Sequence, residues 1–135
     1  MVFYFKGSPQ LLFKYMKVSF LQELEALSSK SDVRCARHSC IIVKQGKIVG
    51  RGWNSLGVSK TAAKYYTYTI HAEAQAILKK RKWDNCDLYV FRFNKKGETL
   101  NSKPCDTCSL LIQRAGIKNV YYSDEHGGVS RWRLK

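Results

Sequence analysis

Hydrophobic and polar residues recur with two different periods along this chain, and the change of period separates helices from strands. Near the N-terminus, Ser8-Pro9 provides a helix cap followed by proline at the first helical position. Apolar residues then recur at helical spacing, at Leu11, Leu12, Tyr15, Met16, Phe20, Leu24 and Leu27. We predict a helix over residues 9–27 whose apolar stripe packs against a sheet.

Short runs of β-branched and aromatic residues predict the first strands. Cys40–Val43 and Ile48–Gly50 flank the polar turn Lys44–Lys47, which predicts a β-hairpin. Leu88–Phe93 is typical of a central strand. The turn that follows it leads into a short extended segment that we expect to end at Ser102.

Two segments in the second half of the chain predict helices. Ala72–Lys82 consists of helix-forming residues, and Cys105–Ala115 forms a second predicted helix that Gly116 ends. Ile117–Tyr122 predicts another strand. Because helices and strands alternate, the sequence predicts one three-layer α/β/α domain over residues 1–135, with a central mixed sheet of about five strands.

The spacing at the C-terminus predicts the direction of the last strand. Ser123–Gly128 separates Ile117–Tyr122 from the β-rich residues that begin at Val129. Parallel neighbours need a connection of about a dozen residues or more, so a strand over residues 129–134 must run antiparallel to the preceding one. We expect His126 to be a turn residue in this connection.

Composition supports one folded domain. The chain has 135 residues, and 44% of them are hydrophobic, which is enough for a core. No apolar run approaches the roughly 20 residues that span a bilayer, and Val2–Phe5 is too short for a signal-peptide core. We therefore expect a soluble, cytoplasmic protein without a membrane partner. Cys35, Cys40 and Cys86 lack disulfide-framework spacing, so we expect them to be reduced.

The charge points to an anionic partner. Lys and Arg total 24 against 10 Asp and Glu, a net charge of +14. These basic residues form short, separate groups: Lys79–Lys82, Lys95–Lys96, Lys103, Arg131, Arg133 and Lys135. A nucleic-acid partner is one interpretation; attraction of a single phosphate and packing in a homo-oligomer are others. Each group alone is more typical of a solvated surface, and only convergence of the groups near the site would make them functional.

Metal-ligand residue types occur in two short motifs. His71-Ala72-Glu73 opens one predicted helix, and Pro104-Cys105-Asp106-Thr107-Cys108 opens the other. One imidazole and two thiolates suit zinc, and three protein ligands leave a fourth tetrahedral position open for water. Glu73 can point at that position without binding the metal, as a general acid/base does. The alternative is a closed structural zinc knuckle.

The pattern H-x-E followed by P-C-x-x-C is the signature of zinc-dependent base deaminases. From about Arg37 to Tyr122 the chain resembles the cytidine and deoxycytidylate deaminase superfamily, which implies Zn²⁺ as cofactor. The resemblance implies that His71, Cys105 and Cys108 bind the metal and that Glu73 is catalytic. It therefore also implies a cytidine-deaminase-like fold.

Substrate contacts follow from the same resemblance. Gly52-Trp53-Asn54 is similar to the family's G-[WY]-N segment, which implies that Asn54 contacts the sugar. The backbone around Ala72 and Pro104-Cys105 is then placed to hold the edge of the base. Tyr66 and Tyr68, in a lysine-containing loop over residues 55–70, either contact the substrate or pack beneath the loop.

The implied reaction is hydrolytic conversion of cytidine, deoxycytidine or deoxycytidylate to its uracil form, with release of ammonia. A polynucleotide-editing deaminase acting on transfer-RNA adenosine or single-stranded cytosine is an alternative that the +14 charge supports. A non-catalytic zinc-bearing nucleic-acid-binding module is another, although Glu73 argues against it. A different aminated ring also remains open as substrate. The short C-terminal hairpin favours the small substrate, and we interpret His38 as a structural histidine.

Overall fold

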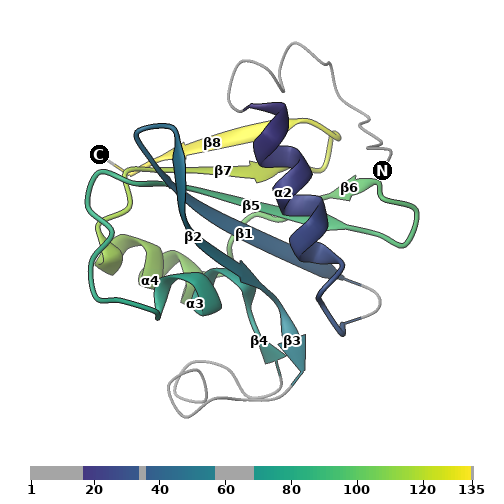
Figure 1. The fold of residues 1–135 in the computed structure, drawn as a ribbon, viewed down its shortest axis with the longest axis horizontal. Coiled ribbons are helices and arrows are strands. Elements are labelled where there is room, and N and C mark those ends of the chain that lie inside the picture. The colour runs from purple at the N-terminus through teal and green to yellow at the C-terminus, as the bar shows by residue number, and fades with distance from the viewer. Residues whose placement is uncertain (1–16, 34–35, 57–68, 135) are drawn as a thin grey trace.

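A mixed β-sheet forms the centre of the fold in the computed structural model, which describes residues 17–33, 36–56 and 69–134. Its strand order is β2-β1-β5-β7-β8, and a short strand, β6, also pairs with β5 (Figure 1). The strands are β1 Arg37–Lys44, β2 Lys47–Trp53, β5 Asp87–Phe93, β6 Thr99–Leu100, β7 Asn119–Ser123 and β8 Val129–Arg133. β5 and β7 are parallel, whereas the other pairs are antiparallel. The predicted mixed sheet of about five strands is confirmed.

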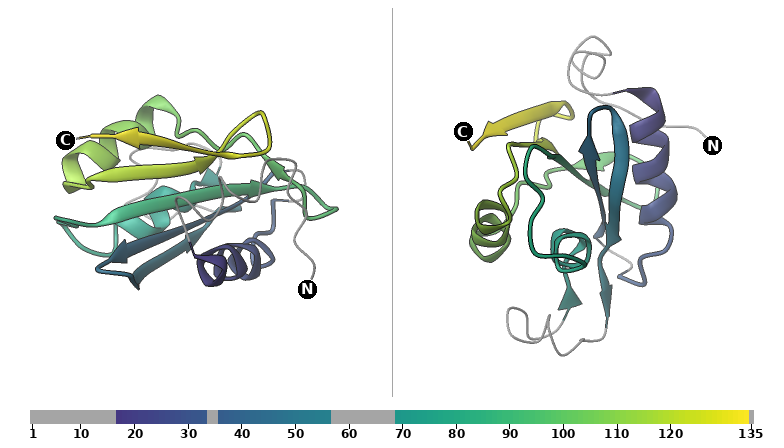
Figure 2. Two further views of the ribbon diagram at one scale, coloured as in Figure 1. Left: turned by 90° about the horizontal axis from the view of Figure 1, so that it is seen from above. Right: turned by 60° about the vertical axis from the view of Figure 1, so that its left-hand side comes forward.

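Helices cover both faces of this sheet. Helix α2 (Val18–Ser28) lies on one face, and α3 (Ala72–Ile77) and α4 (Asp106–Ala115) lie on the other (Figure 2). Alternate residues of β5 separate into the two cores: Leu88 and Val90 pack with α3 and α4, whereas Tyr89 and Phe91 pack with α2. The predicted three-layer arrangement is confirmed. Within the described ranges, no helix is long and apolar enough to cross a membrane.

The first predicted helix is wrong at Lys17, the first of its residues that the structure describes. Lys17 has extended backbone angles, and the helix begins at Val18 and ends at Ser28. Residues 9–16 of the predicted helix lie outside the described residues. Phe20, Leu21, Leu24 and Leu27 are buried against the sheet. The predicted apolar stripe is therefore present on α2. The spacing of apolar residues could not show that Lys17 is not helical, because the helical period continues through this position.

The predicted helix over 72–82 is also wrong at one end, since α3 stops at Ile77. Trp83 causes this early stop. Its indole Nε1 donates a hydrogen bond to the Ile77 carbonyl at 2.9 Å, and its backbone N–H donates to the Ala115 carbonyl at 2.8 Å. The first bond satisfies the carbonyl of the last helical residue, and the second joins the chain to the end of α4. A tertiary contact therefore overrides the helix propensity of residues 78–82.

Helix α4 forms as predicted, with Cys105 as its N-cap residue and a left-handed Gly116 (φ 82°) at its C-terminus. The φ value explains why glycine ends this helix, because other residues rarely adopt it. Helix α4 is also part of the crossover connection that joins the parallel strands β5 and β7.

A two-stranded ribbon flanks part of the predicted substrate loop over residues 55–70. β3 (Ser55–Leu56) pairs antiparallel with β4 (Thr69–Ile70), and β4 leads directly to His71. Tyr66 and Tyr68 lie outside the described residues. The ribbon places the start of α3 at the end of the β1–β2 hairpin (Figure 1).

Gly52 on β2 permits close approach of α3. A Cβ atom at this position would overlap the carbonyl oxygen of Ala72 and lie 2.8 Å from the backbone nitrogen of Ala76. The backbone N–H of Trp53 also donates to the side-chain oxygen of Gln75 at 2.9 Å. Strand β2 therefore fixes the first turn of α3, the helix that follows His71.

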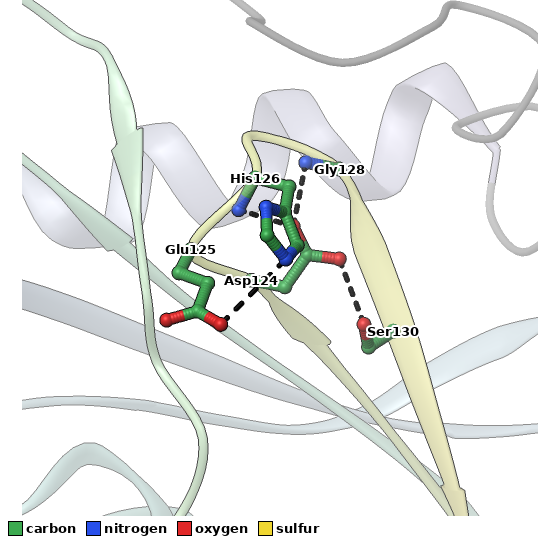
Figure 3. A network of polar contacts seen from close by, with 5 residues as sticks. All are labelled: Asp124, Glu125, His126, Gly128 and Ser130. Atoms are coloured by element: carbon green, nitrogen blue, oxygen red, sulfur yellow. Dashed lines mark hydrogen bonds and ion pairs between the residues drawn. The ribbon is translucent and has the colours of Figure 1, made fainter.

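The C-terminal hairpin is confirmed, because β8 runs antiparallel to β7 with Asn119 opposite Arg133. Figure 3 shows how Asp124 holds the connection. Its carboxylate accepts hydrogen bonds from the backbone N–H groups of His126 and Gly128, at 3.0 and 2.9 Å, and from the Ser130 hydroxyl at 2.7 Å. His126 is an exposed turn residue, as predicted.

Asp124→Ala should lower the free energy of unfolding by about 1–3 kcal/mol at pH 7, because a charged acceptor is lost. Partial burial pushes the pKa of Asp124 upward, but its three hydrogen bonds outweigh this and hold the pKa below the ordinary 3.8. The stabilisation is therefore present above pH 3.8 and is lost as pH falls through the lower folded-state pKa. Urea unfolding from pH 7 down to pH 3 checks this. Glu125→Ala is the control; an equal loss for both variants, or a loss independent of pH, would contradict the assignment.

The described cysteines outside the P-C-x-x-C motif behave as predicted. Cys40 and Cys86 are free thiols buried in the core beneath α3 and α4. Burial raises the pKa of both thiols, so they remain protonated and unreactive. Cys35 lies outside the described residues.

Candidate active site and metal centre

The two motifs meet because α3 and α4 start beside each other on one face of the sheet. His71 is the N-cap residue of α3, Cys105 is the N-cap residue of α4, and Cys108 lies in the first turn of α4. His71 Nδ1 lies 3.8 Å from Cys105 Sγ and 3.5 Å from Cys108 Sγ. All three donor atoms lie within 4.8 Å of one another.

This geometry and donor chemistry fit zinc. Tetrahedral zinc with ordinary bond lengths separates a nitrogen ligand from a sulfur ligand by about 3.6 Å, close to both observed distances. Burial lowers the pKa of His71, which keeps its imidazole neutral and able to bind a metal. Among the residues that the structure describes, no other group of three metal-binding side chains is present. Neither His38 nor Cys40 joins the cluster, so the described residues form a three-ligand site.

Glu73 lies next to this cluster. Its side chain is 4% exposed and lines the same cavity as His71 and Cys105. Burial raises its pKa, and hydrogen bonds from its own backbone and from Cys108 offset part of that effect. A buried carboxyl group with a raised pKa, facing a cavity beside metal ligands, is suited to transferring protons.

The cavity has a volume of about 270 Å³ and opens beside the metal ligands. Its wall includes residues from β1, from the position directly after β2, from α3 and from the segment before α4: His38, Asn54, Ala72, Ser102 and Lys103. Two of the proposed substrate contacts, Asn54 and Ala72, therefore lie in the cavity wall. Pro104 lines an adjacent cavity instead.

Asn54 organises one wall of the cavity. Its side-chain oxygen accepts hydrogen bonds from the His38 backbone N–H at 2.9 Å and from the Ser31 hydroxyl at 2.6 Å. Its amide nitrogen donates to the Ala36 carbonyl at 2.6 Å. Asn54 thus joins the end of β2 to the segment before β1, and its 7% exposed surface faces the cavity.

His38 has a structural role that agrees with its interpretation from the sequence. Its Nδ1 lies 3.3 Å from the Ala36 carbonyl and 3.5 Å from the Asn54 amide nitrogen. Burial, with smaller effects from Arg92 and His71, lowers the pKa of His38 to about 4, so the ring is neutral at ordinary pH. His38 also lines the cavity, which sequence reasoning missed because histidine before a strand has no distinctive spacing.

Ser102 is a second residue that the sequence did not indicate. Its hydroxyl donates to the Val90 carbonyl at 2.7 Å and accepts from the Ser123 backbone N–H at 2.9 Å. The hydroxyl groups of Ser102 and Ser123 lie 2.7 Å apart, and Ser123 also donates to the Leu100 carbonyl. Both side chains are buried. This network attaches the segment before Cys105 to β5 and β7.

Ser102→Ala should lower the free energy of unfolding by about 1–3 kcal/mol, because buried polar groups on β5 and β7 lose a partner. It should also weaken metal binding by about tenfold, because residues that hold ligands in place affect metal affinity strongly. Urea unfolding and zinc competition with a chelator check the two effects. Ser28→Ala, which removes a buried hydroxyl from α2, should reduce stability alone. Unchanged zinc affinity in Ser102→Ala would show that the network does not position Cys105.

The basic groups do not all converge on the cavity. Lys103 lines it, but Lys79 and Lys82 donate to the backbone carbonyls of Arg51 and Arg114, at 2.7 and 3.1 Å. These two lysines are therefore engaged elsewhere on the surface.

Comparison with known proteins agrees with the geometry. The protein-family model for the cytidine and deoxycytidylate deaminase zinc-binding region matches residues 14–124. Deoxycytidylate deaminase from Homo sapiens is 31% identical over 126 residues, covering 82% of this chain and 63% of the human protein. A tRNA-specific adenosine deaminase from Streptococcus pyogenes serotype M1 is 30% identical, covering 85% of this chain and 61% of that protein. The chain thus spans less than two thirds of the length of either relative.

A solved structure shows the same fold. The crystal structure of dCMP deaminase from the cyanophage S-TIM5 has a TM-score of 0.59 and 27% sequence identity, covering 88% of this chain and 86% of the phage chain. The family match contains both motifs, and the structure places their three metal ligands together. The chain belongs to the cytidine and deoxycytidylate deaminase family.

Proposed function

We propose that this chain is a zinc-dependent hydrolytic deaminase that converts a cytosine nucleoside or nucleotide to its uracil form and releases ammonia. The observation that carries the proposal is the arrangement of Glu73, buried in one cavity with a three-ligand metal site. A structural zinc site has no use for a fourth, open position with a carboxyl group beside it. The deoxycytidylate deaminase relatives make deoxycytidylate the first substrate to test.

Zinc held by His71, Cys105 and Cys108 would lower the pKa of water toward neutrality and so supply a nucleophile. Glu73 takes up the proton that the water loses and delivers it to N3 of the cytosine ring as oxygen adds to C4. Glu73 then moves the proton of the new C4 hydroxyl group to the exocyclic amine, and the C4 oxygen becomes the carbonyl of the uracil form. The C4–N bond breaks, ammonia leaves, and the uracil form remains.

The cavity wall supplies the contacts that orient the base in this proposal. Ala72 and Cys105 line the cavity together with Glu73, and their backbone is proposed to hold the edge of the base. Asn54, in the same lining, is the proposed sugar contact. His38 keeps that wall neutral, since its ring carries no charge at ordinary pH. Lys103 is the basic side chain in the described lining and is placed to attract a phosphate.

A substrate panel tests the proposal. The zinc-loaded protein is incubated with cytidine, deoxycytidine, deoxycytidylate, a cytosine-bearing single strand and an adenosine-bearing transfer RNA, and ammonia release is measured. The proposal predicts turnover of at least one of the three small cytosine substrates, with deoxycytidylate the first expectation. Turnover confined to a polymer would overturn the small-substrate assignment.

A polynucleotide substrate is the second candidate, favoured by the +14 charge and by the tRNA-specific adenosine deaminase relatives. The salt dependence of substrate affinity distinguishes a polynucleotide substrate from a small one. A single strand that contacts several basic residues releases several counterions, so its affinity falls steeply between about 50 and 200 mM salt. A mononucleotide offers one phosphate and should show a shallow slope, and a nucleoside almost none.

A further inference from the structure

Eight exposed basic residues gather at one end of the central sheet. They lie at the β1–β2 turn, in the segment between α3 and β5, and between the last turn of α4 and the start of β7 (Figure 1). They are Lys44, Lys47, Arg114, Lys118 and the four residues 79–82, which are all Lys or Arg. These eight residues are called the basic surface below.

The strand register brings the sheet residues of the basic surface together. Lys44 and Lys47 are a cross-strand pair. The residue before Lys44 lies opposite Asp87, the first residue of β5, and Asp87 lies opposite the residue that follows Lys118. Neighbouring strands are about 4.8 Å apart, so these positions span about 15 Å from β2 to β7. The basic surface is therefore elongated.

Hydrogen bonds bring the ends of the two helices to the same place. Lys82 Nζ donates to the Arg114 carbonyl at 3.1 Å, and the Lys118 backbone N–H donates to the Cys86 carbonyl at 2.9 Å. The segment between α3 and β5 thus contacts both the end of α4 and the start of β7. Three groups that are far apart in the sequence form one surface.

Carboxylates do not neutralise this surface. Its strand ends and connections contain two acidic residues, Asp84 and Asp87, against eight basic ones, an excess of six positive charges (8 − 2). Within the described ranges, none of the eight basic side chains forms an ion pair with a carboxylate. Lys79 and Lys82 bond to carbonyl oxygens, which leaves their charge and their other N–H donors available.

The basic surface is remote from the catalytic cavity. The metal ligands lie at the starts of α3 and α4, whereas the basic residues lie at the ends of both helices. On β1, His38 lines the cavity and Lys44 belongs to the basic surface. These two residues are six positions apart, which is about 20 Å along a strand. A polyanion on the basic surface is therefore separate from the reacting base.

The shape and chemistry of this surface fit a nucleic-acid duplex. Phosphates recur about every 3.4 Å along each strand of duplex DNA, so about 15 Å of surface faces about four of them. Single-strand binding also uses accessible aromatic rings, but Trp83, in the segment between α3 and β5, is buried. Membrane binding needs a patch of exposed apolar side chains, and the described residues near these cations offer only Val49 and Leu110, on different elements.

We propose that the basic surface binds the phosphate backbone of a nucleic-acid duplex without reading its sequence. The duplex would hold the protein at the end of the sheet remote from the metal ligands and leave the catalytic cavity free. This binding does not depend on which small substrate the cavity accepts. It gives a role to part of the +14 charge that the cavity does not use.

Fluorescence anisotropy with a short, labelled DNA duplex of mixed sequence measures this binding. The affinity is determined at several salt concentrations between about 50 and 200 mM. Each phosphate contact contributes about −0.9 to the slope of log affinity against log salt concentration, so four contacts predict a slope of about −3.6.

Matched pairs of substitutions locate the bound duplex. Arg81→Gln combined with Lys118→Gln should make the slope shallower by about two and weaken binding about tenfold or more at about 50 mM salt. Lys95→Gln combined with Lys96→Gln makes the same change in net charge in the exposed turn after β5, at the opposite end of that strand. This control pair should keep the wild-type slope. Thermal unfolding checks that both variants fold; if the first does not, Lys44→Gln with Lys47→Gln replaces it.

The proposal is overturned if the duplex does not bind, or if the two pairs change the slope equally. It is also overturned if Lys103→Gln, at the catalytic cavity, weakens duplex binding as much as Lys118→Gln does. Tighter binding to phosphatidylserine vesicles than to the duplex would assign the surface to a membrane instead. Ammonia release is measured separately, and the Arg81 and Lys118 variant should match the wild type. Failure of the proposed function would therefore leave the duplex test intact.

Discussion

Glu73→Gln should retain zinc and fold but deaminate its substrate at least about 10²–10⁴-fold more slowly than the wild type. The amide cannot carry the protons that the reaction must move, and no metal ligand is lost. Because the residue serves more than one proton transfer, the loss should lie at the upper end of this range or beyond it. The checks are initial rates, zinc content by elemental analysis and thermal unfolding.

Glu25→Gln is the matched control for this variant. It makes the same chemical change on α2, which lies on the opposite face of the sheet from the metal ligands. Its turnover should match the wild type. A Glu73→Gln enzyme that keeps wild-type rates would show that Glu73 does not transfer the protons.

Cys105→Ala should cost the protein its metal and the stability that the metal supplies. A ligand that binds only the folded state contributes about 4 kcal/mol when its free concentration is a thousand times its dissociation constant. Cys105 is exposed, so its replacement leaves the core intact. The free energy of unfolding should therefore fall by several kcal/mol in zinc and change little in chelator.

Cys86→Ala separates this metal effect from a packing effect. Cys86 is a buried thiol outside the metal cluster, so the stability lost on its replacement should be the same in zinc and in chelator. Urea unfolding of both variants in both buffers gives the comparison. If Cys105→Ala shows no zinc-dependent loss, the His71–Cys105–Cys108 cluster does not bind the metal.

The residues at the centre of the site could be predicted because their chemistry is local. His71 and Glu73 are two residues apart at a helix start, and Cys105 and Cys108 are three apart on one helix face. Each spacing fixes its motif at the start of one helix, and the fold brings the two helix starts together. The antiparallel β8 was predictable for a similar reason, since the connection before it is too short for a crossover.

Features that depend on distant contacts could not be predicted. The end of α3 is set by Trp83, which reaches back to Ile77. The role of Ser102 depends on β5 and β7 coming together around it, and serine in a short connecting segment has no distinctive pattern. In the same way, only the fold shows that Lys103, Arg131 and Arg133 all border one cavity between α4 and the β7–β8 edge of the sheet.

The measurement that tests the central claim most directly is the joint quantification of ammonia and deoxyuridylate formed from deoxycytidylate by the zinc-loaded protein. Hydrolytic deamination at the His71–Cys105–Cys108 site predicts the two products in equal amounts. It also predicts that chelation of zinc abolishes both products, that returning zinc to the chelated wild type restores them, and that Glu73→Gln slows the formation of both by at least about 10²–10⁴-fold. Folded, zinc-loaded protein that forms neither product, or that forms both at the same rate after Glu73→Gln, would contradict the account.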